Sequence, residues 1–324
     1  MSLGSSASRA KISLLTATAI VVANMVGTGV FTSLGFQVGD LPSGFTILML
    51  WLVGGVCALC GALCYGELAA ALPRSGGEYH LLSQVYHPAA GFLAGWLSAT
   101  VGFAAPIALA AMAFGKYFAH VAPLSSPLLM SIGLVVLVTL IHLRGVGVGA
   151  VFQNVATAFK VALILGLIGA GLAMTSPQPV SFLPHAGASG LITSAPFAVS
   201  LVYVMYAYSG WNASAYIVGE IDRPWRNVPL SLAIGTSLVA ILYLALNAVL
   251  FRSAPLAELS GGGEEVSHIA AAHIFGAAGG KIIAGLISFG LISSISAMTW
   301  IGPRVTMAMG EDYRAFAFLG RKNQ

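Results

Sequence analysis

The chain has 324 residues, of which 58% are apolar and only 7% are charged. Soluble domains carry roughly 25% charged residues, so water could not solvate so apolar a surface. Composition therefore excludes a soluble globular protein and indicates an integral membrane protein surrounded by a lipid bilayer. The basic residues are scattered over loops, which argues against a nucleic-acid-binding surface. We expect no cleaved signal peptide, because the first apolar segment is too long for the h-region of one.

Eight apolar segments are each close to the roughly 20 residues that a bilayer-spanning helix needs. They predict an all-α integral membrane fold with spans near 12–36, 44–72, 91–119, 126–143, 149–174, 194–219, 229–251 and 281–309. Short helices are predicted over 80–86, at the membrane interface, and near 266–276. Residues 175–193 contain three prolines and no charged residue, which indicates an ordered extracellular loop.

The basic residues orient these spans, because cytoplasmic loops carry an excess of Lys and Arg. With the N-terminus inside, ten of the fourteen basic residues lie on the inner side and three at the outer side, while Lys160 lies within the membrane. The opposite orientation would reverse this bias. The sequence therefore predicts a multi-pass protein of the cell membrane, with a cytoplasmic tail over 1–11 and a cytoplasmic C-terminal end over 310–324.

A Gly-Thr-Gly sequence, Gly27 to Gly29, lies in the middle of the first span. Each glycine in a helix costs about 1 kcal/mol relative to alanine, so the sequence favours a helix that is broken there. Backbone N–H groups freed at membrane depth need an acceptor. In transporters the positive end of a half-helix points at an anionic substrate group. We therefore expect Gly27, Thr28 and Gly29 to bind a carboxylate.

The sixth span has a second unusual centre, where aromatic, small and polar residues replace lipid-facing ones. Ser209-Gly210 would allow local unwinding, and carbonyl groups near residues 206–209 could accept the protons of an ammonium group. The candidate substrate-binding residues here are Tyr206, Ala207, Tyr208, Ser209 and Asn212. Glycine and serine in either span alone could equally be packing residues. Breaks in spans one and six together match two inverted five-helix repeats and favour a site for an amino-acid zwitterion.

Lys160 lies deep in the fifth span, where inserting a lysine costs at least about 2.5 kcal/mol. It is about eight residues from the inner end of the span, too deep to snorkel easily to the surface. We expect a proton-responsive ammonium that couples transport to protons and bonds to serines of the eighth span. The candidate partners are Ser293, Ser294 and Ser296.

The other potentially reactive residues do not indicate a catalytic or metal-binding site. Cys57, Cys60 and Cys64 share one helix face, and we expect them to be small packing residues between helices rather than metal ligands. Glu220 and Asp222 are expected to form interfacial pairs with the adjacent Arg223 and Arg226. No span combines a nucleophile, a base and an orienting group, so the sequence predicts neither an enzyme nor a cofactor.

Several motifs in order along the chain resemble the amino acid–polyamine–organocation permeases. They are Gly27–Phe31, Tyr65–Ala69, Pro73–Tyr79, Gly91–Trp96, Ala207–Asn212 with Glu220, Arg226–Pro229, and Gly302–Val305 with Ala308-Met309. The resemblance implies the LeuT-type fold and amino acid transport. It places residues 27–29 at the carboxylate site, Tyr206 at an aromatic gating position and Asn212 in the pocket. Lys160 matches the lysine that proton-coupled members and exchangers carry in place of a sodium ion.

The chain also departs from this family. Ser296 stands where many members have Asn, and the chain stops after its eighth span, whereas the family's transport core has ten helices. We therefore expect a first repeat over 12–174, an extracellular loop over 175–193 and an incomplete second repeat over 194–309, in a truncated or fragmentary permease.

The leading functional prediction is a secondary active carrier of amino acids that works by alternating access, through proton coupling or exchange. The central stretches of spans one and six contain no acidic residue, which favours neutral substrates over cationic ones. The alternative is a truncated membrane scaffold, or a fragment of a permease, that transports nothing.

Overall fold

The computed structural model describes residues 11–121 and 126–320, which form helices and loops with no strand among them. The α-helices are α1 (Leu14–Met25), α2 (Gly29–Gln37), α3 (Gly44–Ala71), α4 (Glu78–Val85), α5 (Pro88–Leu97), α6 (Ala105–Val121) and α7 (Pro127–Leu143). They continue with α8 (Val146–Leu172), α9 (Ala188–Ile192), α10 (Ala195–Tyr208), α11 (Pro224–Ser253), α12 (Leu256–Gly261), α13 (Val266–Phe275) and α14 (Gly279–Asp312). A π-helix (Ser98–Ala104) joins α5 to α6, and 3₁₀ turns cover Ala213–Tyr216 and Val218–Glu220.

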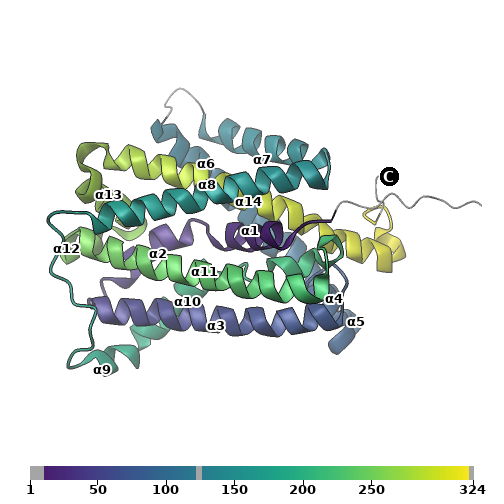
Figure 1. Ribbon diagram of the computed structural model, residues 1–324, viewed down its shortest axis with the longest axis horizontal. Helices are drawn as coiled ribbons and strands as arrows, with labels where there is room; N and C mark the ends of the chain where they lie inside the picture. Colours follow the sequence, from purple (N-terminus) through teal and green to yellow (C-terminus); the bar gives the residue numbers. More distant parts are fainter. Residues whose placement is uncertain (1–10, 122–125, 321–324) are drawn as a thin grey trace, which may run out of the picture.

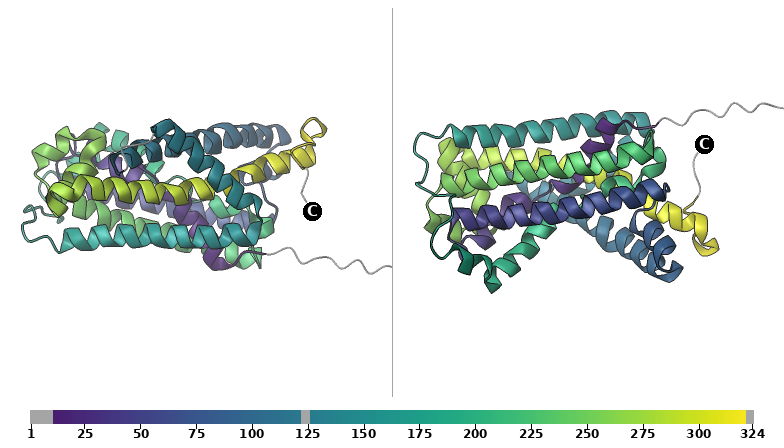
Figure 2. Two further views of the ribbon diagram at one scale, coloured as in Figure 1. Left: turned by 90° about the horizontal axis from the view of Figure 1, so that it is seen from above. Right: turned by 60° about the horizontal axis from the view of Figure 1, so that its bottom comes forward.

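Each of the eight predicted spans corresponds to a helix or a broken helix. Six stretches of the described chain are long and apolar enough to cross a membrane: Leu14–Gln37, Gly44–Ala71, Pro88–Ala119, Val146–Leu172, Pro224–Ser253 and Gly279–Asp312. The fourth and sixth predicted spans are the shorter helices α7 and α10. The prediction of an all-α membrane fold is confirmed. The long helices run along the long axis of the molecule in both views of Figure 2.

Some boundaries differ from those predicted. The seventh span begins at Pro224 rather than at residue 229, because proline has the backbone angle of a first helical residue. Helix α14 continues to Asp312, into the predicted C-terminal end. The predicted tail over 1–11, apart from Lys11, and the last four residues of the chain lie outside the described residues.

Serine side chains cap the N-termini of three of the spans. The hydroxyl oxygens of Ser13, Ser43 and Ser194 accept hydrogen bonds from the amides three residues later, at 3.3 Å in each case. These bonds satisfy amide groups that have no acceptor within a helix. They fix the starts of α1, α3 and α10.

Helix α1 lies at the centre of the bundle, where it packs against α8, α11 and α14 (Figure 1). Its residues Ala17, Ile20, Val21 and Ala23 are fully buried. Helix α11 packs along α3, and α14 packs along α6. The central position of α1 means that a break at its end lies inside the protein rather than in lipid.

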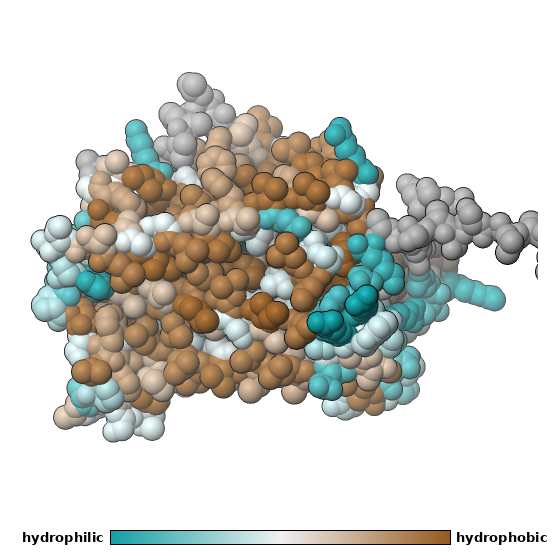
Figure 3. Space-filling model, in the orientation of Figure 1, coloured by the Kyte–Doolittle hydropathy of each residue, from teal (hydrophilic) through white to brown (hydrophobic). Residues whose placement is uncertain are grey.

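The outer surface matches a protein surrounded by lipid. An apolar belt covers the middle of the molecule in Figure 3, and hydrophilic residues gather at its two ends. Helices α7 and α8 contribute exposed apolar side chains to the surface, among them Leu129, Ile132, Val151 and Val155. Because a soluble monomer rarely exposes so continuous an apolar surface, the belt indicates a multi-pass membrane protein.

Ion pairs at the end of the molecule that carries α4 join segments that are distant in sequence. Arg74 bonds to Asp312, with Nη2 and Oδ1 2.9 Å apart, and also to Glu311. Arg304 Nε lies 2.6 Å from Glu220 Oε1. The predicted pairing of Glu220 with Arg223 or Arg226 is therefore wrong, because tertiary packing offers Glu220 a partner 84 residues away.

The three cysteines do not pack between helices, contrary to the prediction. Cys57, Cys60 and Cys64 are all free and exposed on α3. Their spacing correctly places them on one face of the helix. That face points away from the bundle, which the spacing alone does not determine.

Gly35 provides a test of how α2 is held. A Cβ atom at Gly35 would lie 1.8 Å from the carbonyl oxygen of Gly263, whereas one at Gly133 in α7 would meet nothing within 4 Å. Because backbone atoms cannot move aside cheaply, we expect Gly35→Ala to lower the temperature of thermal unfolding by several degrees. Gly133→Ala is the matched control and should not lower it, because an alanine fits there and is the better helix former. Equal unfolding temperatures for the two purified variants would contradict this packing.

Candidate functional site

The first span is broken where the sequence predicts. Helix α1 ends at Met25, Val26 is extended with ψ of 94°, and α2 begins at Gly29. Within the described chain, the amides of Gly27 and Thr28 donate to no backbone carbonyl. The first amides of α2 also have no acceptor inside their own helix. The break therefore presents a set of backbone donors at a helix N-terminus, an arrangement that favours an anion.

The carbonyl groups at the other side of this break are bonded by Lys160 and Ser294. Lys160 Nζ donates to the carbonyls of Val26 at 2.6 Å and Ala23 at 3.1 Å, and also lies 2.7 Å from Ser294 Oγ. Ser294 Oγ in turn donates to the Val26 carbonyl at 2.7 Å. The Lys160 amino group thus stands at the C-terminal end of α1, where the helix dipole is negative and favours its charged form.

The second break follows α10. Ser209 leaves the helix with an extended ψ of 148°, and Gly210 has φ of +97°, a conformation that favours glycine. A Cβ atom at Gly210 would lie 2.4 Å from Asn24 Nδ2, so the close approach of α1 also requires glycine. Asn24 Nδ2 donates to the Gly210 carbonyl at 3.4 Å and links the two breaks.

Tyr243 of α11 ties the ends of both broken helices together. Its hydroxyl lies 2.8 Å from the carbonyl oxygen of Met25, the last residue of α1, and 3.0 Å from that of Ala207 in the last turn of α10. Tyr243 is fully buried, and its ring packs edge-on against Trp51. One hydroxyl therefore serves two carbonyl groups that the helix breaks leave without helical donors.

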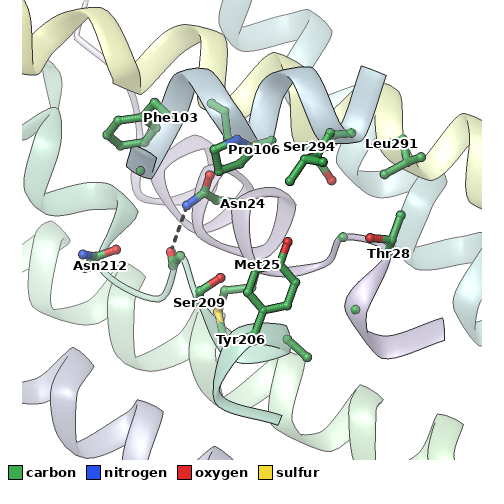
Figure 4. A pocket seen from close by; sticks show the side chains of 18 of the residues that line it. Asn24, Met25, Thr28, Phe103, Pro106, Tyr206, Ser209, Asn212, Leu291 and Ser294 are labelled. Carbon is green, nitrogen blue, oxygen red and sulfur yellow. Dashed lines mark hydrogen bonds between the residues drawn. The ribbon is translucent and has the colours of Figure 1, made fainter. Parts of the chain in front are cut away.

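A cavity of about 250 Å³ lies between the two breaks (Figure 4). Its walls come from α1, α2, the π-helix, α6, α10, α14 and the segments at the two breaks. The lining residues are Asn24, Met25, Gly27, Thr28, Gly29, Gly102, Phe103, Pro106, Leu109, Ala110, Tyr206, Ala207, Ser209, Gly210, Asn212, Tyr216, Leu291, Ser294 and Met298. None of these side chains carries a charge, so the cavity suits a neutral or zwitterionic ligand that is bonded by dipoles.

Most of the predicted substrate-binding residues meet in this cavity. Gly27, Thr28, Gly29, Tyr206, Ala207, Ser209 and Asn212 all line it. Tyr208 does not, because it is fully buried and its hydroxyl donates to the carbonyl of Trp51 at 3.1 Å. Successive helical residues point about 100° apart, so Tyr206 and Tyr208 cannot share one face of α10.

The predicted coupling residues are only partly brought together. Lys160 bonds to Ser294, as described above, whereas Ser293 Oγ lies 3.0 Å from Thr157 Oγ1 and 3.3 Å from Gln153 Nε2. Ser296 Oγ lies 2.9 Å from His142 Nε2 at the end of α7. Of the three candidate serines, Ser294 is therefore the one that the structure places against the ammonium.

Several cavity residues were not predicted from the sequence. Asn24 lies one turn before the first break, and a polar residue in that apolar helix is a signal that could have identified it. Phe103 lies in the π-helix of the third span, and Pro106 follows it. Proline at 106 cannot donate to the Gly102 carbonyl, which accounts for the irregular helix there. No sequence pattern could have assigned Tyr243 to both breaks.

A family model described as amino acid permease matches residues 12–320. The b(0,+)-type amino acid transporter 1 of Mus musculus is 29% identical over 249 residues, which cover 74% of this chain and 51% of the relative. The serine/threonine exchanger SteT of Bacillus subtilis (strain 168) is 28% identical over 93% of this chain and 68% of the relative. The human cystine/glutamate transporter is 29% identical over 77% and 51%.

The relatives are considerably longer than this chain. It spans about half the length of the mouse and human relatives and about two thirds of the bacterial one. All three are named as transporters or exchangers rather than as enzymes.

Replacing Tyr243 tests the link between the two helix breaks. Tyr243→Phe leaves the carbonyls of Met25 and Ala207 without their shared donor and should destabilise the protein by about 1–3 kcal/mol. We expect a lower thermal unfolding temperature in detergent. Tyr203→Phe is the matched control, because that ring is 42% exposed on α10 and its loss of a hydroxyl should have little effect. Equal effects of the two substitutions would refute the link.

Proposed function

Because the chain belongs to the amino acid permease family, we propose that it carries amino acids across the cell membrane as a secondary transporter. The observation that carries this proposal is the uncharged cavity between two broken helices, with backbone donors at one side and backbone oxygens at the other. An amino-acid zwitterion complements this arrangement, because its negative carboxylate accepts from donors and its positive ammonium donates to oxygens. Its carboxylate would bind at residues 27–29 and its ammonium at the carbonyl oxygens near residues 206–209.

Neutral amino acids are the proposed substrates. The absence of charged side chains among the described cavity residues leaves no partner for a charged substrate side chain. Burying an unpaired charge there would be costly, so cationic and anionic side chains are disfavoured. The Bacillus subtilis relative, named a serine/threonine exchanger, is consistent with neutral cargo.

Transport would proceed by alternating access, with the N-terminus in the cytoplasm. Arg74–Asp312 and Arg304–Glu220 join distant helices at the end that carries α4, which on the orientation above faces the cytoplasm. Ile12 adds a backbone contact to these ion pairs. Its N–H donates to the carbonyl of Glu220, in the segment after α10, at 2.8 Å. Release of these contacts would open the cavity toward the cytoplasm.

Uptake into proteoliposomes tests the proposal. We expect vesicles that contain the purified chain and internal unlabelled amino acid to accumulate labelled neutral amino acids faster than empty vesicles. Arginine and glutamate should compete poorly. If no amino acid binds or enters, the chain is a non-transporting scaffold, and the proposal fails for it.

The carboxylate site can be tested at Gly27, which lines the cavity. A Cβ atom added there has no other atom within 4 Å. Gly27→Val should therefore leave the unfolding temperature close to that of the unmodified chain while reducing amino acid binding at least about tenfold. Retained binding would place the carboxylate elsewhere. Gly29 is a poorer test, because its Cβ would lie only 3.1 Å from Ala207 Cα.

Lys160 is the proposed proton-responsive group. Loss of its proton would weaken its bonds to Ala23 and Val26 and so bias the movement of α1. Lys160→Arg keeps a donor at this position, but arginine does not deprotonate in proteins, so initial uptake should lose its pH dependence between about pH 5 and pH 8. Lys160→Gln should also give a flat profile. A variant that keeps the profile of the unmodified chain would leave Lys160 with a structural role only.

A further inference from the structure

Asn212 stands at one end of the cavity with its amide group held in a fixed orientation. Its Nδ2 donates to Oε1 of Glu78, the first residue of α4. A carboxylate can only accept hydrogen bonds, so the nitrogen of Asn212 must face Glu78. The oxygen then faces the other way. In Figure 4 the nitrogen of Asn212 points outward and its oxygen points toward the segment with Ser209 that borders the cavity.

Both carboxylate oxygen atoms of Glu78 accept hydrogen bonds. Its Oε2 accepts from the hydroxyl of Tyr216, which also lines the cavity. Tyr216 and Asn212 are both part of the segment that follows α10, so Glu78 fixes that segment from a helix outside the spans. Because Tyr216 gives its proton to Glu78, its hydroxyl has no proton left to donate to the cavity.

Asn24 adds a second oriented amide from the opposite broken helix. Its Nδ2 donates to the carbonyl of Gly210, which again can only accept. Its Oδ1 is buried and has no hydrogen-bond partner within the described chain. A buried acceptor without a donor is unfavourable, and a donor that arrived with the substrate would relieve it.

We propose that Glu78 is a positioning residue that makes this end of the cavity, between Asn24 and Asn212, a subsite with two oriented amide oxygens as acceptors, which selects neutral amino acids whose side chain ends in a hydroxyl or amide donor. This inference rests on the proposed function. It adds to that function a class of preferred substrates and a role for Glu78, which does not touch the substrate. Substrates with purely aliphatic side chains would leave the oriented oxygens unpaired, so they bind more weakly.

L-Threonine and L-valine are the decisive pair of probes, because they have nearly the same shape and differ in one hydroxyl. Isothermal titration calorimetry of the chain in nanodiscs should give an affinity for L-threonine at least about tenfold higher than for L-valine. L-Serine should likewise exceed L-alanine. Equal affinities within each pair would overturn the inference while leaving the proposed function intact. Absence of binding by all four would overturn the proposed function, and this inference with it.

Variants of Glu78 test its positioning role. Glu78→Leu frees the Asn212 amide to rotate, so the affinity ratio of L-threonine to L-valine should fall toward one. Glu78→Gln keeps an acceptor oxygen for Asn212 Nδ2 and should restore most of the ratio. A substitution that merely damaged the fold would weaken both ligands alike and leave the ratio unchanged, and that result would overturn the positioning role.

Asn212→Leu tests the other partner of this hydrogen bond, the side chain that lines the cavity. It removes the oriented oxygen itself, so the preference for L-threonine should disappear even with Glu78 present. Asn227→Leu is the control, because Asn227 does not line the cavity and its side chain bonds to the backbone carbonyl of Asp222. A preference that survives Asn212→Leu would refute the subsite.

Discussion

Backbone polar groups that a broken helix exposes must find partners where no water is available, and the centre of this protein is organised around that constraint. Two spans are broken, so two sets of carbonyls and amides are freed in the interior. Lys160, Ser294 and Tyr243 bond the carbonyls, each from a different helix. The packing of α8, α11 and α14 around α1 is what delivers these three side chains. Among the described residues, the amides of Gly27 and Thr28 in the first break have no backbone acceptor, and they are the proposed donors to a substrate carboxylate.

The same constraint gives the cavity its polarity without any charged side chain. Donors come from the backbone at residues 27–29, whereas the oriented amides of Asn24 and Asn212 offer oxygen. Fixed dipoles in a dry site interact more strongly with a ligand than they would in water. A zwitterion can therefore be held without a salt bridge, whose desolvation would be costly and whose release would be slow.

The predictions that failed share one physical cause. Periodicity places Cys57, Cys60 and Cys64 on one face of α3 but says nothing about which face meets the bundle. Sequence proximity predicts that Glu220 pairs with its neighbouring arginines, whereas in the structure it pairs with Arg304. Tyr208 shares a motif with Tyr206 but points to the opposite side of α10. Side-chain direction relative to neighbouring helices is a property of packing, which a single sequence does not display.

The sequence by itself determined the membrane class, the eight helical segments, the break at Gly27–Gly29 and seven of the residues around the cavity. These follow from local physics: apolar length, the helix cost of glycine and the price of a charge in lipid. Only the tertiary structure decided that Ser294, rather than Ser293 or Ser296, meets Lys160, that Tyr243 joins the two breaks and that Glu78 orients Asn212. Each of these contacts joins residues at least 36 positions apart, and the sequence holds no local signal for such a distance.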